Sequence, residues 1–265
     1  PRSTLEADRR QRQMCIRDSG EDAWPHRKDM VADVIREHAD IAGLQEAQLN
    51  QIQDLAKRLP GFKWYGVGRD DGKEGGEYCP VFYRESRYEL LEKKTLWLSE
   101  TPEVPGSKGW DTAITRLITM VQFKDLESDV KFWVLNTHFD HRGRAARENS
   151  ARLIRQHFGR LSQQLPVIVT GDFNCMPDGK PYALMTAAEP GAKLIDSRTV
   201  AKKAPLGPDS TWNGFKAIAP GRRIDFIFVT PAIEVRQHRT IDDQVKGRFP
   251  SDHLPIVVDL VFDKR

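Results

Sequence analysis

The chain has 265 residues, of which 39% are hydrophobic and 30% are charged, a balance typical of a globular protein and unlike that of a disordered one. Its 41 Lys and Arg against 38 Asp and Glu leave a net charge of +3, too small an excess to require nucleic acid as a partner. We expect a single domain over residues 1–265, because no repeat, linker or change of composition divides the chain.

The first 22 residues differ from the rest. They are rich in Arg, Asp, Glu and Gln without a sustained period, so we expect an arm outside the core. The run Arg12 to Ser19 looks like translated sequencing adapter, which would make residues 1 to about 19 an artefact. No apolar run approaches the ~20 residues of a membrane span, and no signal peptide is apparent. We expect a soluble monomer, cytoplasmic or exported.

The remaining chain carries alternating helix and strand patterns. In chain order they predict a helix over 25–37, a strand over 41–44, a helix over 49–59, and strands over 62–67 and 81–83 around a glycine-rich loop at 69–77. Next come strands over 88–98, 115–123 and 130–136, expected to be antiparallel neighbours, a long helix over 144–165, and strands over 167–170, 224–229, 233–237 and 254–262. Many strands with interspersed helices favour a layered α/β domain with mixed sheets.

Acid, amide and imidazole side chains recur where predicted strands meet loops. Strand ends suit reactive groups, because the strand fixes their direction and the loop leaves access. Five such places together favour a single polar site. They are Gln45-Glu46, Thr137-His138, Gly171-Asp172-Phe173-Asn174, Asp225, and Ser251-Asp252-His253.

Each motif could also have a purely structural role instead of a catalytic one, and these alternatives stay open. Glu46 suits a helix N-terminus, Asp172 suits a turn, and His138 suits a hydrogen-bonded core position. Asp225 lies within an apolar strand, where an unpaired charge is costly, so it needs a partner. His253 is the candidate.

As a set, these motifs resemble the endonuclease/exonuclease/phosphatase (DNase I-like) superfamily, over a stretch from about Trp24 to the C-terminus. The resemblance implies a four-layer α/β sandwich, two packed mixed β-sheets flanked by helices. It also implies Mg²⁺-dependent hydrolysis of a phosphodiester or phosphomonoester by in-line attack of an activated water, with Mn²⁺ as a substitute. The matching segments are Leu-Gln-Glu at 44–46, Asn-Thr-His at 136–138, Gly-Asp-Phe-Asn at 171–174, Arg-Ile-Asp-Phe-Ile-Phe at 223–228 and Ser-Asp-His at 251–253.

The resemblance also implies a metal site. Glu46 matches the principal Mg²⁺ ligand of the family, and Asp252 matches a second acid at the metal. One departure concerns the family's first strand, which carries an Asn near the metal. Cys15 stands at about that position, and a thiol cannot replace a carboxamide. Either metal binding is weakened or the true start of the chain has been lost.

The catalytic roles implied by the resemblance fall on five residues. Asp172 and Asn174 match the pair that handles the attacking water and the phosphate oxygens, with Asp172 orienting the water. His138 matches a phosphate contact. His253 is expected to bind phosphate, with its imidazole aligned by Asp225.

The substrate is less well defined by the sequence. Arg116, His141 and Trp212 are candidate substrate-binding residues, the first two as cations and the third as a stacking surface. Solvated surface charge is the alternative for the cations. Loops at 69–77, 102–110 and 211–215 resemble a bacterial branch of the superfamily with no secure substrate.

Three other functions stay open. A nucleic-acid endo- or exonuclease would use the same site but normally needs a broad basic face. A dinuclear metallohydrolase of another fold is suggested by His138, Asp140 and His141, although Asn136 stands where that pattern needs a histidine. A catalytically weakened binding module is favoured only by the missing Asn.

Overall fold

The computed structural model describes residues 20–187 and 193–262. The helices are η1 (Gly20–Asp22), α2 (Trp24–His38), α3 (Leu49–Arg58), α4 (Arg144–Ser162), α5 (Lys180–Thr186) and α6 (Ser197–Val200). The strands are β1 (Ile41–Gly43), β2 (Phe62–Tyr65), β3 (Val81–Arg84), β4 (Tyr88–Trp97), β5 (Leu117–Asp125), β6 (Lys131–His138), β7 (Val167–Asp172), β8 (Ile195–Asp196), β9 (Asp225–Val229), β10 (Ile233–Thr240) and β11 (Ile256–Phe262).

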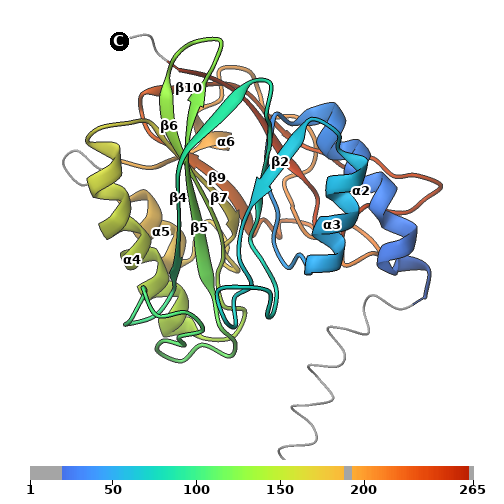
Figure 1. Ribbon diagram of the computed structural model, residues 1–265. Helices are drawn as coiled ribbons and strands as arrows, with labels where there is room; N and C mark the ends of the chain where they lie inside the picture. The colour runs from blue at the N-terminus through green and yellow to red at the C-terminus, as the bar shows by residue number, and fades with distance from the viewer. Residues whose placement is uncertain (1–19, 188–192, 263–265) are drawn as a thin grey trace, which may run out of the picture.

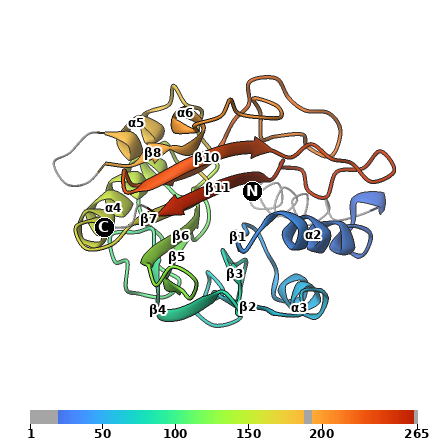
Figure 2. The ribbon, with the colours of Figure 1, turned by 90° about the horizontal axis from the view of Figure 1, so that it is seen from above.

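A six-stranded sheet of order β4-β5-β6-β7-β9-β8 forms one inner layer of the molecule (Figure 1). It is mixed, because β6 and β7 are parallel whereas the other neighbours are antiparallel. The second inner layer consists of two hydrogen-bonded groups, β1-β3-β2 and β10-β11. The view from above shows α4 and α5 on one outer side and α2 and α3 on the other (Figure 2).

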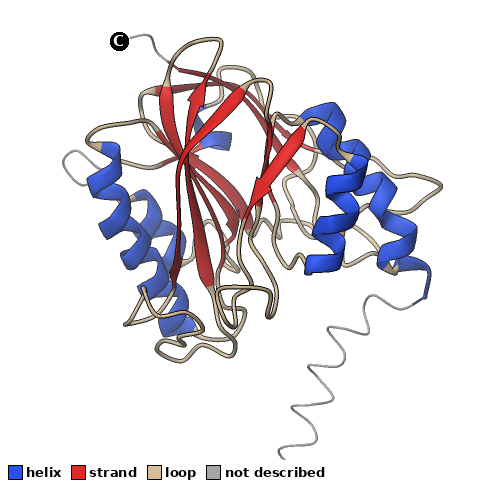
Figure 3. Cartoon of the chain, viewed as in Figure 1, coloured by secondary structure: helices blue, strands red, loops and turns tan. Residues whose placement is uncertain are grey.

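Three apolar cores hold these layers together. One packs α4 and α5 against the six-stranded sheet through residues such as Ile154 and Met185. A second lies between the strand layers and includes Phe123 and Phe132. A third packs α2 and α3 against β2 and β3 and includes Ile52. Figure 3, in the view of Figure 1, shows these two helices beside the strands. The predicted four-layer α/β sandwich is therefore confirmed.

Several predicted boundaries were wrong. The long helix ends at Ser162 rather than at residue 165, because Pro166 disfavours helical backbone just before it. The last strand begins at Ile256 rather than at residue 254, because Pro255 has no N–H to pair. The short elements α5, β8 and α6 were not predicted at all. The expected N-terminal arm, including Cys15, lies largely outside the described residues.

No helix in the described parts of the chain has both the length and the apolar character needed to cross a membrane.

Gly171 lets β7 approach β6 closely at the end of the sheet. A Cβ at this position would lie 2.1 Å from the backbone oxygen of Thr137. Because backbone cannot move aside as a side chain can, we expect Gly171→Ala to destabilise the fold by about 3 kcal/mol or more, the upper end of the usual cost of overpacking. Chemical denaturation measures this. Gly61→Ala is the control, since Gly61 has a positive φ but nothing within 4 Å, and should cost only about 1–2 kcal/mol.

Candidate active site

The six-stranded sheet brings three of the expected site residues together. His138 ends β6, Asp172 ends β7 and Asp225 begins β9. The register pairs His138 with Asp172 across the parallel strands and Asp172 with Asp225 across the antiparallel strands. Directly paired residues project from the same face of a sheet. The three side chains therefore lie in a row at one edge of the molecule.

His253 joins this row from the turn before β11. Its Nδ1 lies 2.8 Å from Oδ2 of Asp225, so the buried carboxylate has the partner that its position in an apolar strand requires. Burial by itself lowers the pKa of His253, but Asp225, its hydrogen bond, and the nearby Asp172 and Asp252 outweigh burial and raise this pKa to about 10. His253 is therefore a cation at neutral pH.

This pairing predicts how Asp225→Asn changes the histidine. The pKa of His253 should fall, because the variant loses the carboxylate that favours the imidazolium. In the native protein the stabilisation from this ion pair is fully present below the ordinary histidine pKa of 6.5 and is lost only as pH rises through about 10. NMR titration of the His253 ring should show this fall in the variant. An unchanged pKa would contradict the assignment.

Asp172 lies in the middle of the row and is 5% exposed. Burial, followed by the negative charge of Asp225, raises its pKa to about 8. Its Oδ1 accepts a hydrogen bond from the backbone N of Asn174 at 2.8 Å, which fixes the carboxylate at the end of the strand. Asp172 is therefore a carboxylate that holds a proton far more readily than an exposed aspartate does.

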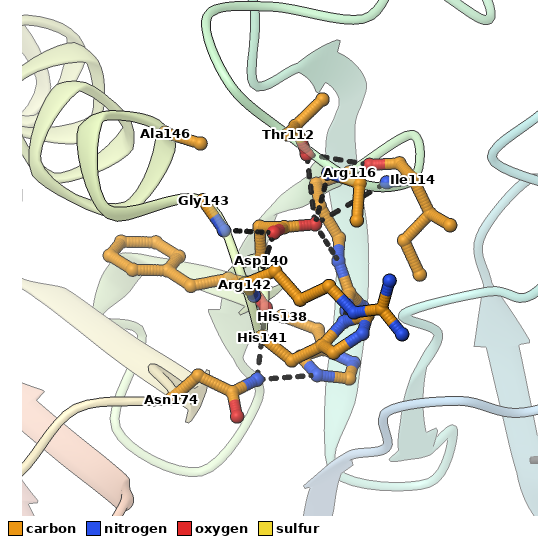
Figure 4. A network of polar contacts seen from close by, with 12 residues as sticks. Thr112, Ile114, Arg116, His138, Asp140, His141, Arg142, Gly143, Ala146 and Asn174 are labelled. Atoms are coloured by element: carbon orange, nitrogen blue, oxygen red, sulfur yellow. Dashed lines mark hydrogen bonds and ion pairs between the residues drawn. The ribbon is translucent and has the colours of Figure 1, made fainter. Parts of the chain in front are cut away.

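Asn174 orients the imidazole of His138 (Figure 4). Its Nδ2 lies 3.0 Å from Nε2 of His138 and donates also to the carbonyl oxygen of Phe139 at 3.0 Å. An amide nitrogen can only donate, so Nε2 of His138 accepts and Nδ1 carries the proton. That Nδ1 lies 3.9 Å from Oε1 of Glu46. Burial and Arg116 hold the pKa of His138 well below its ordinary value, so the ring is neutral.

Glu46 reaches the same place from the opposite layer of strands. It follows β1 with a positive φ of 58°, and its side chain is half exposed at 52%. Partial desolvation in the pocket, followed by the negative charges of Glu77 and Asp252, raises its pKa to about 7. Glu46, Asp172, Asp225, Asp252 and His253 all line one pocket of about 1220 Å³.

The donor set of this pocket fits a hard divalent cation. Ligand atoms of Asp172, Asp225 and His253 lie within 4.8 Å of one another. Because His253 is charged and bound to Asp225, carboxylate oxygens are the more suitable ligands. The raised pKa values of Glu46 and Asp172 arise in part from mutual repulsion among these acids, which a cation would relieve. Mg²⁺ favours such oxygen ligands.

The three candidate substrate-binding residues occupy different environments. His141 and Trp212 line the pocket, whereas Arg116 is only 4% exposed and lines a separate small pocket that it shares with His138. The interpretation of Arg116 as a solvated surface charge is therefore wrong. The ring of Trp212 meets that of His253 edge-on at 4.8 Å, and the guanidinium of Arg222 lies over it at 4.6 Å. Protein groups thus already occupy part of the Trp212 ring surface.

Asp140 does not face the pocket as a metal ligand would. Its Oδ2 accepts hydrogen bonds from Oγ1 of Thr112 and the backbone N of Ala113, and its Oδ1 accepts from the backbone N of Arg142 and of Gly143 (Figure 4). Both oxygens are therefore used within the loops. The dinuclear site suggested by His138, Asp140 and His141 is ruled out by this geometry.

Sequence reasoning missed the segment that supports the histidine. Oγ1 of Thr211 accepts hydrogen bonds from the backbone N of Ile224 and of Asp225. The backbone N of Asn213 donates to the carbonyl oxygen of Asp252, and Trp212 pairs with His253 as an isolated β-bridge. Residues 211–214 thus hold the Asp225 and His253 motifs together. No charge or periodicity in Thr-Trp-Asn-Gly signals this role.

Known proteins share the fold of this chain. A crystal structure of an endonuclease/exonuclease/phosphatase from Bacteroides vulgatus is 39% identical, with a TM-score of 0.87 and coverage of 92% of this chain and 93% of that one. A mannosyl-6-phosphatase from Bacteroides thetaiotaomicron is 36% identical, with a TM-score of 0.85 and coverage of 92% and 96%. An uncharacterized protein of Acanthamoeba polyphaga mimivirus is 28% identical over 159 residues, which are 57% of this chain and 59% of that protein.

This chain spans about half the length of the curated relatives it matches. The sequence model of the Endonuclease/Exonuclease/phosphatase family matches residues 14–253. The chain belongs to that family, whose members hydrolyse phosphoester bonds.

Proposed function

We propose that this chain is a Mg²⁺-dependent phosphomonoesterase that hydrolyses a sugar phosphate by in-line attack of an activated water. The observation that carries the proposal is the convergence of Asp172, Asp225 and His253 with Glu46 and Asp252 in a single pocket. Phosphoester hydrolysis needs three kinds of group: carboxylates that can hold a cation, a base, and a fixed positive charge such as an imidazolium.

The chain's own residues have distinct roles in this proposal. Asp172 orients the attacking water and accepts its proton, and its raised pKa makes it a stronger base than an exposed aspartate. His253 binds a phosphate oxygen as a cation, with Asp225 holding its ring. His138 binds a further phosphate oxygen through the Nδ1–H of its neutral ring, and Asn174 holds that ring in place through its Nδ2.

Glu46 and Asp252 would hold the Mg²⁺ together with neighbouring carboxylate oxygens. When bound, the ion supplies positive charge that favours the carboxylate form of Asp172 and neutralises charge on the leaving oxygen.

Two observations support a sugar phosphate over nucleic acid. The 36% identical structure that aligns over nearly the full length of both chains is a mannosyl-6-phosphatase. The net charge of +3 does not supply the broad positive surface that a duplex nuclease uses. A pocket with a few local cations is enough for a small monoester.

A phosphoester panel tests the proposal. Mannose 6-phosphate, p-nitrophenyl phosphate, bis-p-nitrophenyl phosphate and an oligonucleotide are assayed with Mg²⁺, Mn²⁺ or EDTA. We expect turnover of both monoesters with Mg²⁺, with Mn²⁺ as a substitute, and no turnover with EDTA. Preference for the diester or the oligonucleotide would replace this proposal with the nuclease alternative. Absence of both turnover and Mg²⁺ binding would favour the binding-module alternative.

A further inference from the structure

A contact between Arg116 and His141 fixes the chemistry of a residue at the edge of the pocket. Nη2 of Arg116 lies 3.2 Å from Nδ1 of His141. A guanidinium is always protonated and can only donate, so Nδ1 of His141 must accept. In a neutral imidazole the proton then resides on Nε2. Arg116 therefore selects one tautomer of His141 and makes Nε2 a donor.

The surroundings hold both side chains in place (Figure 4). Asp140, which is 1% exposed, binds the 112–114 loop with one carboxylate oxygen and the backbone of Arg142 and Gly143 with the other. Nε of Arg116 lies 3.8 Å from Oδ2 of Asp140. The segments before Arg116 and around His141 are thus tied to a single buried carboxylate.

The same surroundings keep His141 uncharged. Burial first, and then the positive charges of Arg116, Arg142 and Arg69, lower its pKa, while Asp140 acts in the opposite direction. A charged imidazole binds phosphate more strongly than a neutral one does, and His253 already supplies that cation in this pocket. A neutral donor suits a neutral acceptor. His141 lines the same pocket as Asp172 and His253, whereas Arg116 does not.

We propose that His141 donates a hydrogen bond from Nε2 to an uncharged oxygen of the leaving group, a hydroxyl or ring oxygen of a sugar, and that Arg116 is the positioning residue that fixes this tautomer. This inference rests on the proposed function, because it concerns the part of a sugar phosphate that lies beyond the phosphorus. It assigns Arg116 no contact with substrate, since the guanidinium is buried behind the pocket.

Kinetics with two monoesters test the role of His141. His141→Ala should lower kcat/KM for mannose 6-phosphate roughly 5- to 100-fold, mainly through KM, because a substrate oxygen loses its partner. For p-nitrophenyl phosphate, whose leaving group has no hydroxyl of this kind, the loss should stay below about 3-fold. His141→Gln should retain most of the activity, because its amide nitrogen can occupy the position of Nε2. Arg144→Ala, at an exposed site nearby, is the control and should leave kcat/KM unchanged for both substrates.

Nitrogen-15 NMR tests the role of Arg116. The ring signals of His141, assigned by their loss in His141→Gln, should show the Nε2–H tautomer in the native protein. Arg116→Gln should give a mixture of tautomers and a pKa closer to 6.5, so that KM for mannose 6-phosphate becomes dependent on pH near neutrality. If Arg116→Gln does not fold, the native spectrum still tests the tautomer of His141, and the His141 variants still test its contact with substrate.

Four outcomes would overturn the inference. Equal losses on both substrates in His141→Ala would show that the residue acts on the phosphate or on folding. No loss on either would show that it does not bind substrate, and an Nδ1–H tautomer would remove the role of Arg116. If the native enzyme hydrolyses p-nitrophenyl phosphate but no sugar phosphate, then the proposed sugar-phosphate substrate is wrong, and this inference fails with it.

Discussion

Asp172→Asn is expected to lower kcat by about 10²- to 10⁴-fold, the range that a general base contributes, while the protein remains folded. Asparagine keeps an oxygen that can accept the hydrogen bond from the backbone N of Asn174, but it cannot accept a proton from water. The midpoint of thermal unfolding should stay the same or rise, because the variant removes a buried carboxylate that lies beside Asp225.

Steady-state kinetics on p-nitrophenyl phosphate with saturating Mg²⁺, together with thermal unfolding, provides the measurement. Asp178→Asn is the matched control, because Asp178 is exposed and follows the same strand by only a few residues. Full turnover in Asp172→Asn would assign proton removal to another group. A large loss in Asp178→Asn would mean that the loop itself, and not the base, controls the rate.

Glu46→Gln is expected to raise the Mg²⁺ concentration needed for half-maximal activity by at least about 10-fold, because an anionic ligand is replaced by a neutral one. Glu74→Gln is the control, since Glu74 is an exposed acid in the 69–77 loop. Turnover is measured over a Mg²⁺ titration in metal-free buffer. Equal Mg²⁺ requirements in the native enzyme and in Glu46→Gln would remove Glu46 from the metal site.

The same residue predicts a dependence on pH. The pKa of Glu46 is raised to about 7 without metal, so the carboxylate takes up a proton as pH falls through 7. Mg²⁺ must displace that proton, so its apparent affinity should weaken below pH 7 and become independent of pH well above it. Calorimetry in buffers of different ionisation enthalpy should detect proton release near pH 7. Glu46→Gln should lose this part of the release.

A layered α/β domain with polar residues at its strand ends was predictable because these signals are local, whereas the four layers followed from the family resemblance. Each motif combines an apolar strand with a polar residue at its end, and both features are visible within a few residues. The partner of Asp225 was also predictable, since burial of its charge requires one, and His253 was the candidate.

The environment of Arg116 was not predictable in this way. The acids that favour its charge include Asp140, 24 positions later, and Glu77, 39 positions earlier, and no local pattern links these residues. The role of residues 211–214 was hidden for a related reason. Their hydrogen bonds to the Asp225 and His253 motifs are made largely by backbone groups and one hydroxyl, which the residue types do not reveal.

Because His138, Asp172 and Asp225 are aligned by strand register, their spacing does not depend on the length of the surrounding loops. Exchange of the 69–77 and 102–110 segments for those of a related enzyme should therefore alter which molecules are accepted without disturbing the reaction itself. A family with such a sheet can acquire new substrates by changing its peripheral loops while the catalytic residues and the reaction stay the same.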